Sequence, residues 1–142
     1  MLEKTSTKYS LGMVFGVFDG FHPGHQHFLT EALKHCDKLI VVVAHPDIVQ
    51  ALKDRTPYCS PEERLAAVRA FSERLEATLG DESIGQWTAL KTHQPDIVLL
   101  GYDQERLGTE LKKLHIRTRV ITAHFPTKFK SSLIYKDKIS SE

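Results

Sequence analysis

Two histidines, His22 and His25, lie in a glycine-rich segment that could bind phosphate groups. Residues 16–25 read Gly-Val-Phe-Asp-Gly-Phe-His-Pro-Gly-His and follow directly on the apolar tract Leu11–Phe15. If this tract is a strand and a helix starts near Gly24, both imidazoles lie at a helix N-terminus, where unpaired backbone N–H groups and a partial positive charge attract anions. Imidazole N–H groups add donors that can stabilise charge developing on a phosphate. The segment therefore predicts phosphate chemistry.

Other uses of these histidines stay open on the residue types alone. His22 and His25 could be surface residues of a loop, or they could bind zinc together with His27, because histidine is a frequent zinc ligand. No cysteine or carboxylate set nearby completes a tetrahedral site, so we expect no metal site built by the protein. Asp19 in the same turn could orient a histidine or hold a metal-bound water. His45 is a further residue of interest, since it directly follows a second apolar tract.

The hydrophobic pattern indicates which elements would position these residues. Continuous β-branched runs such as Leu39–Ala44 are typical of strands buried on both faces, as in a parallel sheet. Apolar residues at helical spacing predict helices between such runs, and Ser60 followed by Pro61 and two acids marks one helix start. Strands are expected over residues 11–18, 39–44, 77–79, 95–101 and 119–122, and helices over 24–36, 60–75, 84–90, 107–114 and 131–138.

This alternation of strands and helices predicts an α/β fold. Right-handed crossovers between the strands give a Rossmann-like open parallel sheet of about five strands with helices on both faces. Ligands of such sheets bind beyond the carboxyl ends of the strands, near the point where the strand order reverses. Three tracts follow strands in this way, namely residues 16–25, 44–47 and 101–103, and they are the expected ligand-binding tracts.

Size and composition restrict the possible functions. The 142 residues are expected to form one domain, 1–142, and a hydrophobic content of 41% is ordinary for a soluble globular protein. A formal charge of +1 disfavours a nucleic-acid partner bound by bulk electrostatics. The longest apolar run, Leu39–Ala44, is too short to cross a bilayer, so no membrane partner is expected. Two cysteines make no disulfide framework, which favours a cytoplasmic protein.

Residues 16–25 resemble the signature of the cytidylyltransferase-like nucleotidyltransferase superfamily, whose hallmark is His-x-Gly-His. The resemblance continues along almost the whole chain, in the order and spacing of that family. It covers the family's second strand, its lysine-containing loop, the helix with an active-site arginine, and the fourth strand with its ligand turn, at residues 37–43, 52–57, 61–65 and 95–104 respectively.

The resemblance implies nucleotidyl transfer, in which a phosphomonoester attacks the α-phosphate of a nucleoside triphosphate and pyrophosphate leaves. The implied catalytic residues are His22, His25 and Lys53, and the implied acceptor-binding residues are Arg64 and Asp19. On residue type alone, Lys53 could equally be a solvated lysine, and Arg64 could form a surface ion pair with a neighbouring glutamate. The implied nucleotide-binding residues are Gly16, Val17, Phe18, Asp19, His22, His25, Gly101, Asp103, Ser131, Ser132 and Lys136.

A second family motif, commonly Ile-Ser-Ser-Thr-x-Ile-Arg, matches residues 130–136 only in part. Ser131 and Ser132 fit as donors at a helix start, but Leu133 replaces the expected hydroxyl residue and Lys136 stands where arginine is usual. This departure leaves open a catalytically weak nucleotide-binding protein on the same fold. The family also implies a Mg²⁺ ion held largely by the substrate and water, and often a homodimer.

Two local likenesses favour one pair of substrates. Residues 16–26 resemble the adenylyltransferase module of bacterial FAD synthetases, and residues 101–104, with the compact layout, resemble archaeal-type FAD synthases. Both likenesses imply AMP transfer from ATP to FMN. The alternative enzyme is a CTP:glycerol-3-phosphate cytidylyltransferase, which has the same layout and takes CTP as its donor. An RNA-binding role is disfavoured by the near-neutral charge.

Overall fold

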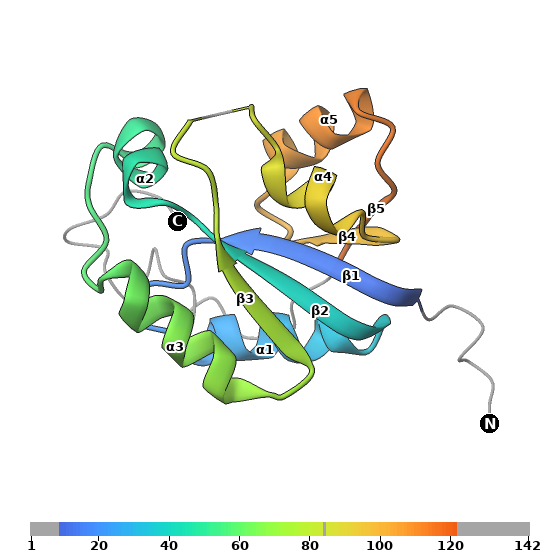
Figure 1. Cartoon of the computed structure of the whole chain (residues 1–142), viewed down its shortest axis with the longest axis horizontal. Coiled ribbons are helices and arrows are strands. Elements are labelled where there is room, and N and C mark those ends of the chain that lie inside the picture. Colours follow the sequence, from blue (N-terminus) through green and yellow to red (C-terminus); the bar gives the residue numbers. More distant parts are fainter. Residues whose placement is uncertain (1–8, 84, 122–142) are drawn as a thin grey trace.

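The computed structural model describes residues 9–83 and 85–121, in which strands and helices alternate (Figure 1). In chain order these elements are β1 (Tyr9–Gly16), α1 (Pro23–Leu33), β2 (Cys36–Val43), α2 (Pro46–Lys53), α3 (Pro61–Phe71), β3 (Leu75–Leu79), α4 (Thr88–His93), β4 (Ile97–Leu100), α5 (Glu105–Lys113) and β5 (Thr118–Val120).

Five parallel strands form one open sheet in the order β3-β2-β1-β4-β5. The chain builds one half of the sheet outward from β1 to β3 and then crosses back to place β4 on the other side of β1 (Figure 1). The strand order therefore reverses between β1 and β4, which is where ligands bind in sheets of this kind. The α/β, Rossmann-like fold that the sequence predicts is confirmed.

Helices cover both faces of the sheet, again as the sequence predicts. On one face, α1 and α3 bury Leu29 and Val68 in a cluster that includes Val14 of β1. On the other face, α4 and α5 bury Leu90 and Leu111 against the same strands (Figure 1). Because successive strand residues point to opposite faces, strands covered on both sides must be apolar along their whole length. The continuous β-branched runs in the sequence have this physical cause.

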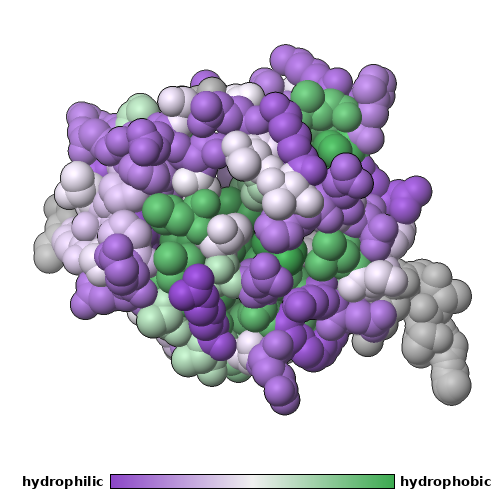
Figure 2. Space-filling view, in the orientation of Figure 1, coloured by the Kyte–Doolittle hydropathy of each residue, from purple (hydrophilic) through white to green (hydrophobic). Residues whose placement is uncertain are grey.

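The face of the molecule drawn in Figure 2 is mainly hydrophilic. Figure 2 shows hydrophilic residues around the rim of one face and apolar residues gathered near its middle. Among the described residues, exposed large apolar side chains include Leu79 at the end of β3 and Val120 of β5, which lie at the two edges of the sheet. No helix within residues 9–83 and 85–121 is long and apolar enough to pass through a membrane.

Several boundaries near the start and middle of the chain differ from the predicted ones. α1 ends at Leu33, and Cys36 begins β2 instead of ending that helix. β1 ends at Gly16 rather than at residue 18, because Phe18 has a φ of 53°, outside the strand region. α3 ends at Phe71, and Leu75 begins β3 instead of continuing the helix. The cause is Ser72, whose extended backbone ends the helical hydrogen bonding.

Other predicted elements need correction as well. α4 begins at Thr88 rather than at residue 84, since Trp87 before it has a left-handed backbone. The last described strand ends at Val120 rather than at residue 122. The short helix α2 was not predicted, because its eight residues make little more than two turns, too few for hydrophobic periodicity to distinguish a helix from a loop. The helix expected over residues 131–138 lies outside the described residues.

Candidate active site

The turn between β1 and α1 is unusually constrained. Phe18, Gly20 and Phe21 all have positive φ angles, of 53°, 79° and 36°. A Cβ atom at Gly16 would lie 2.7 Å from the ring of Phe18, so glycine is needed there for the ring to fold back over the strand end. Backbone conformations of this kind cost free energy and concentrate at functional sites.

His22 forms the N-cap of α1. Its Nδ1 accepts a hydrogen bond from the backbone N–H of Gly24 at 3.0 Å, and Pro23 occupies the first helical position, where a backbone N–H is not needed. A neutral His22 with Nδ1 as acceptor carries its proton on Nε2. The cap therefore satisfies one helix N–H with a side chain that, unlike a carboxylate cap, also carries an N–H group, at a place where anions are favoured.

His25 packs directly against His22. The two rings are stacked with 3.7 Å between their centroids, while Phe18 and Phe21 pack on His25 with centroid distances of 5.4 and 6.3 Å. Burial, followed by repulsion from His22, lowers the pKa of His25 from 6.5 to about 3. His25 is therefore neutral near pH 7. A neutral imidazole at this place suits hydrogen-bond donation to a phosphate rather than proton transfer by an imidazolium.

Asp19 connects this turn to the loop before α3. Its side chain is only 2% exposed, and its two carboxylate oxygens accept hydrogen bonds from the backbone N–H groups of Tyr58 at 2.7 Å and Cys59 at 2.9 Å. Arg55 Nη1 lies 3.7 Å from the same carboxylate. In this structure Asp19 therefore holds the backbone of the loop before α3, and its expected part in orienting a histidine or a metal-bound water stays a prediction.

Arg64 is buried at the same place, with a side chain that is 1% exposed. Its Nη1 donates to the carbonyls of Val17 and Ala44 at 3.0 and 2.9 Å, and its Nε donates to the carbonyl of Cys59 at 3.3 Å. The guanidinium thus joins the chain after β1 to the chain after β2 and to the loop before α3. Burial lowers the pKa of Arg64, and the nearby carboxylate of Asp19 acts in the opposite direction.

The alternative of a surface ion pair for Arg64 is ruled out by this burial. The neighbouring Glu63 is used elsewhere: its side chain accepts from the N–H of Ser60 at 2.8 Å, and the Ser60 side chain accepts from the N–H of Glu63. This reciprocal capping box starts α3. The helix start predicted at Ser60 is thereby confirmed, and it turns Arg64 toward the sheet.

Gln104 links the two strands between which the strand order reverses. Its side-chain oxygen accepts from the N–H of Gly101 at 2.9 Å, and its side-chain nitrogen donates to the carbonyl of Phe15 at 2.9 Å. A Cβ atom at Gly101 would lie 3.1 Å from a carboxylate oxygen of Asp103, so that turn is tightly packed. Sequence reasoning did not give Gln104 a role, although it directly follows the tract 101–103 that was expected to bind the ligand.

Helix α2 begins at the same edge of the sheet. His45 is its N-cap, with Nδ1 accepting from the N–H of Asp47 at 3.0 Å. Lys53, expected in a loop, is instead the last residue of α2, which ends because Asp54 takes a left-handed conformation with φ of 54°. The predicted nucleotide ligands Ser131, Ser132 and Lys136 lie outside the described residues.

The structure thus brings most predicted site residues to one edge of the sheet. We call the edge where the strands end the carboxyl edge and the opposite one the amino edge. The turn after β1, the start of α2 and the turn after β4 all lie at the carboxyl edge, and Arg64 and Gln104 bond across them. The predicted residues at this edge are Gly16, Val17, Phe18, Asp19, His22, His25, Arg64, Gly101 and Asp103.

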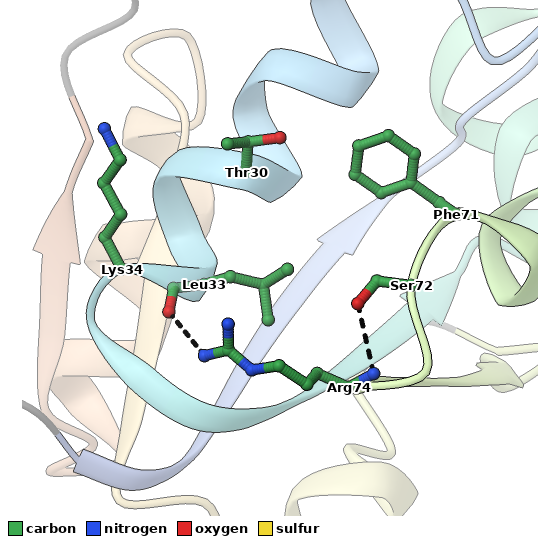
Figure 3. A pocket seen from close by; sticks show the side chains of 6 residues that line it. All are labelled: Thr30, Leu33, Lys34, Phe71, Ser72 and Arg74. Carbon is green, nitrogen blue, oxygen red and sulfur yellow. Dashed lines mark hydrogen bonds between the residues drawn. The ribbon is translucent and has the colours of Figure 1, made fainter.

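A cavity of about 500 Å³ lies at the amino edge, away from the histidines. Figure 3 shows it between the end of α1 and the segment that joins α3 to β3, lined by Thr30, Leu33, Lys34, Phe71, Ser72 and Arg74. The guanidinium of Arg74 is bound to the carbonyl of Leu33, and Lys34 pairs with Glu31 at 2.9 Å. With its cations already paired and no histidine or acid lining it, this cavity lacks the groups needed for phosphate chemistry.

Known proteins match this chain over most of its length, both in sequence and in fold. The family model described as cytidylyltransferase-like matches residues 13–142. A FAD synthase of Thermococcus sibiricus is 38% identical over 128 residues, which cover 87% of this chain and 85% of that protein. A FAD synthase of Archaeoglobus profundus is 40% identical over 110 residues, covering 75% of this chain and 69% of that protein.

Solved structures of other proteins have a similar fold. The lipopolysaccharide core biosynthesis protein of Thermoplasma volcanium superposes with a TM-score of 0.68 at 31% identity, covering 82% of this chain and 98% of that one. Pantothenate synthetase of Thermus thermophilus superposes with a TM-score of 0.57 at 14% identity, covering 80% of this chain and 55% of that one. The second likeness concerns the fold alone.

Proposed function

This chain belongs to the cytidylyltransferase-like family, as residues 16–25 predict, and from that membership we propose that it transfers AMP from ATP to FMN, forming FAD and pyrophosphate. The family and the relatives named FAD synthase make it a nucleotidyltransferase enzyme. The choice of ATP and FMN is supported by those relatives, which match this chain over most of its length.

The observation that carries the proposal is the stacked pair of imidazoles at the N-terminus of α1. In the reaction, an oxygen of the FMN phosphate attacks the α-phosphorus of ATP. The bond from that phosphorus to the bridging oxygen of the β-phosphate breaks, and pyrophosphate takes the electron pair. Negative charge shifts onto the phosphate oxygens, and N–H groups of His22, His25 and the first turn of α1 donate hydrogen bonds to it. Because the attacking phosphate is an anion at neutral pH, no general base is needed.

Other residues act by position and charge. In the proposal, Lys53 adds a positive charge to the phosphates, and Gly101 and Asp103 contact the nucleotide at the turn after β4. Arg64 and Asp19 fix the backbone around the triphosphate through their bonds to residues 17, 44, 58 and 59. A rigid arrangement of this kind keeps both phosphates in position for attack, which is the main source of rate in phosphoryl transfer.

Enzymes of this type generally depend on a metal ion, and we propose that Mg²⁺ enters bound to the triphosphate as part of the substrate. Within residues 9–83 and 85–121, no group of three or more His, Cys, Asp or Glu side chains could hold a metal ion. Both oxygens of Asp19 already accept backbone hydrogen bonds. The described residues therefore do not fit a metal held by the protein alone. A cytoplasmic location belongs to the proposal, since Cys36 and Cys59 are thiols rather than a disulfide.

The test measures pyrophosphate release and product formation with MgCl₂ present. ATP and CTP are each paired with FMN and with glycerol 3-phosphate, and FAD is identified by chromatography. We expect release and FAD formation with ATP and FMN only. Release with CTP and glycerol 3-phosphate would contradict the proposal and favour the cytidylyltransferase alternative, while nucleotide binding without release in all four mixtures would contradict it as well. A His25→Ala variant serves as the control for contaminating activity.

A further inference from the structure

Phe21, directly before the N-cap of α1, has an unusual backbone conformation for a large side chain. Its φ is 36°, in the left-handed region that bulky residues rarely adopt. The carbonyl of Phe21 accepts a hydrogen bond from Nε2 of Gln26 at 3.1 Å, which fixes the backbone at this point. Strained conformations persist only where other interactions of the same residue stabilise them. The Phe21 ring makes contacts that can do so.

The ring of Phe21 contacts both His25 and helix α3. It lies nearly parallel to the imidazole of His25, at an interplanar angle of 22° and with 6.3 Å between the centroids. The ring of Phe71, the last residue of α3, packs edge-on against Phe21 at 79° and 5.5 Å. Both phenylalanines also pack against the buried cluster on this face of the sheet. A continuous series of ring contacts therefore connects the core to His25.

Helix α3 supports the active-site turn at two points of one helix face. Arg64 and Phe71 are seven residues apart, about two turns, so they lie on the same side of the helix. Val68 lies between them in the sequence and is fully buried. Arg64 holds the backbone of the turn through the carbonyl of Val17, and Phe71 packs on the Phe21 ring. The helix can therefore fix both the backbone of the turn and the ring that lies against His25.

The rings around His25 enclose part of its imidazole. Nδ1 of His25 is buried, although the side chain as a whole is partly exposed. His22 stacks on it at 3.7 Å, and Phe18 packs on it at 5.4 Å. Among the described residues, the titratable group that acts on the pKa of His25 is His22, whereas Phe18 and Phe21 carry no charge. Because apolar rings cannot hydrate a cation, they favour the neutral imidazole.

We propose that Phe21 is a positioning residue of the active site, whose ring holds the imidazole of His25 against that of His22 and shields it from water, while Phe71 supports Phe21 from α3. The inference rests on the proposed function, because it takes His25 as a donor to the phosphates. Phe21 touches neither substrate in this scheme and acts through His25. A donor that is already oriented needs no rearrangement when charge develops on the phosphate, which is how preorganised groups contribute to the rate.

The first experiment measures the pKa of His25 by NMR titration of its imidazole signals in the wild type, in Phe21→Ala and in Tyr9→Ala. Tyr9 is the matched control, since it is a partly buried aromatic residue of the same cluster but lies at the amino edge, where β1 begins. We expect a pKa of about 3 in the wild type and in Tyr9→Ala. In Phe21→Ala we expect it to rise by at least about one pH unit, because the imidazolium regains water. An unchanged pKa in Phe21→Ala, or an equal rise in Tyr9→Ala, would overturn the inference.

Phe71→Leu is a milder variant at a residue that contacts Phe21. We expect the pKa of His25 to rise in the same direction but by less than in Phe21→Ala, because Phe21 loses its edge-on partner while the core keeps an apolar side chain. An unchanged pKa in Phe71→Leu would overturn the part assigned to Phe71. This variant also keeps the inference testable if Phe21→Ala does not fold, which circular dichroism shows.

Steady-state kinetics with ATP and FMN separate positioning from binding. We expect Phe21→Ala to lower kcat about tenfold and to leave KM for ATP within about threefold, because the donors remain but are no longer aligned. Tyr9→Ala should keep both within about twofold. An unchanged kcat in Phe21→Ala would overturn the positioning role. If the wild type forms no FAD, the proposed function fails, whereas the NMR titration still decides whether Phe21 controls His25.

Discussion

Two arginines of this chain have nearly the same bonding pattern at opposite edges of the sheet. Arg64, at the carboxyl edge, donates to the carbonyls of Val17, Ala44 and Cys59. Arg74, at the amino edge, donates to the carbonyls of Leu33, Cys36 and Asp37, at 2.8, 2.6 and 2.9 Å. Arg74 is exposed to solvent, whereas Arg64 is buried and keeps one nitrogen without a partner among the described residues.

The difference between the two arginines follows from the direction of the helices. At the amino edge α1 ends, and the unpaired carbonyls of a helix C-terminus carry partial negative charge that favours a cation such as Arg74. At the carboxyl edge helices begin, and their N–H groups carry partial positive charge that opposes Arg64. The partial charges at the amino edge therefore favour Arg74, whereas those at the carboxyl edge oppose Arg64, whose charge the buried carboxylate of Asp19 partly offsets. This comparison explains why the cavity of Figure 3 lacks the chemistry that the carboxyl edge has.

The largest expected effect comes from His25. His25→Ala should lower kcat for FAD formation about 10²- to 10³-fold, as expected for the loss of one donor to a transition-state anion. His25→Phe keeps a ring packed between Phe18 and Phe21 and should lose as much activity, which separates the donor from the packing. Steady-state kinetics and circular dichroism measure both effects. Near-normal turnover in His25→Phe would show that the imidazole is a packing residue.

A paired substitution of the two arginines tests the comparison directly. Lysine keeps the charge but cannot reproduce three hydrogen bonds from one planar group. We expect Arg64→Lys to lower the free energy of unfolding by about 1–3 kcal/mol, because buried carbonyls lose their donors, and to reduce kcat/KM about tenfold. Arg74→Lys, at a solvated position, should cost less than about 1 kcal/mol and leave kcat/KM within about twofold. Urea unfolding and kinetics give both values, and equal losses in the two variants would contradict the difference between the edges.

Acid should destabilise the carboxyl edge through His25. The unfolded chain protonates this histidine near pH 6.5, whereas burial holds its pKa at about 3 in the folded state. The stabilisation is therefore complete above pH 6.5 and is lost as the pH falls toward 3. From this group alone the loss is at most about 1.4 kcal/mol per pH unit. Unfolding curves between pH 4 and 7 should be less steep in pH for His25→Phe than for the wild type, and identical slopes would refute the assignment.

The smallest effect is expected at the cavity of the amino edge. Lys34 is exposed and pairs with Glu31 at 2.9 Å within one helix. Lys34→Ala should change the free energy of unfolding by no more than about 0.5 kcal/mol, because exposed ion pairs contribute little. FAD formation should be unchanged. A clear loss of activity in this variant would show that the amino edge takes part in the function. It would contradict the difference between the two edges of the sheet.

Local sequence patterns predicted local structure well. The β-branched run before His45 predicted a buried strand, and β2 is buried along most of its length. Ser60 and the acids after it predicted the start of α3, which a capping box confirms. The order Gly-x-Phe-Asp-Gly-x-His-x-Gly-His predicted two histidines at a helix start, and the structure places His22 and His25 there. These features depend on residues a few positions apart, so the sequence pattern contains them.

The long-range hydrogen bonds that hold the site together could not be predicted in the same way. The bond from Tyr58 to Asp19 joins residues 39 positions apart, and that from Arg64 to Val17 spans 47 positions. The bond from Gln104 to Phe15 spans 89. Helix α2, which lies beyond the ends of the strands (Figure 1), was missed because eight residues give too short a periodic pattern. Hydrophobic periodicity reports burial against a neighbour and says nothing about which distant segment that neighbour is.

By itself the sequence determined the fold class, the strand-turn-helix that holds the histidines, and the family to which the chain belongs. Only the tertiary structure decided that Asp19 and Arg64 bind backbone groups, that Gln104 joins β1 to β4, and that Arg64 joins the chain after β1 to the chain after β2. The physical reason is the order of the strands. The sheet places β2 and β4 on the two sides of β1, and only that placement brings residues from distant parts of the chain within hydrogen-bonding distance.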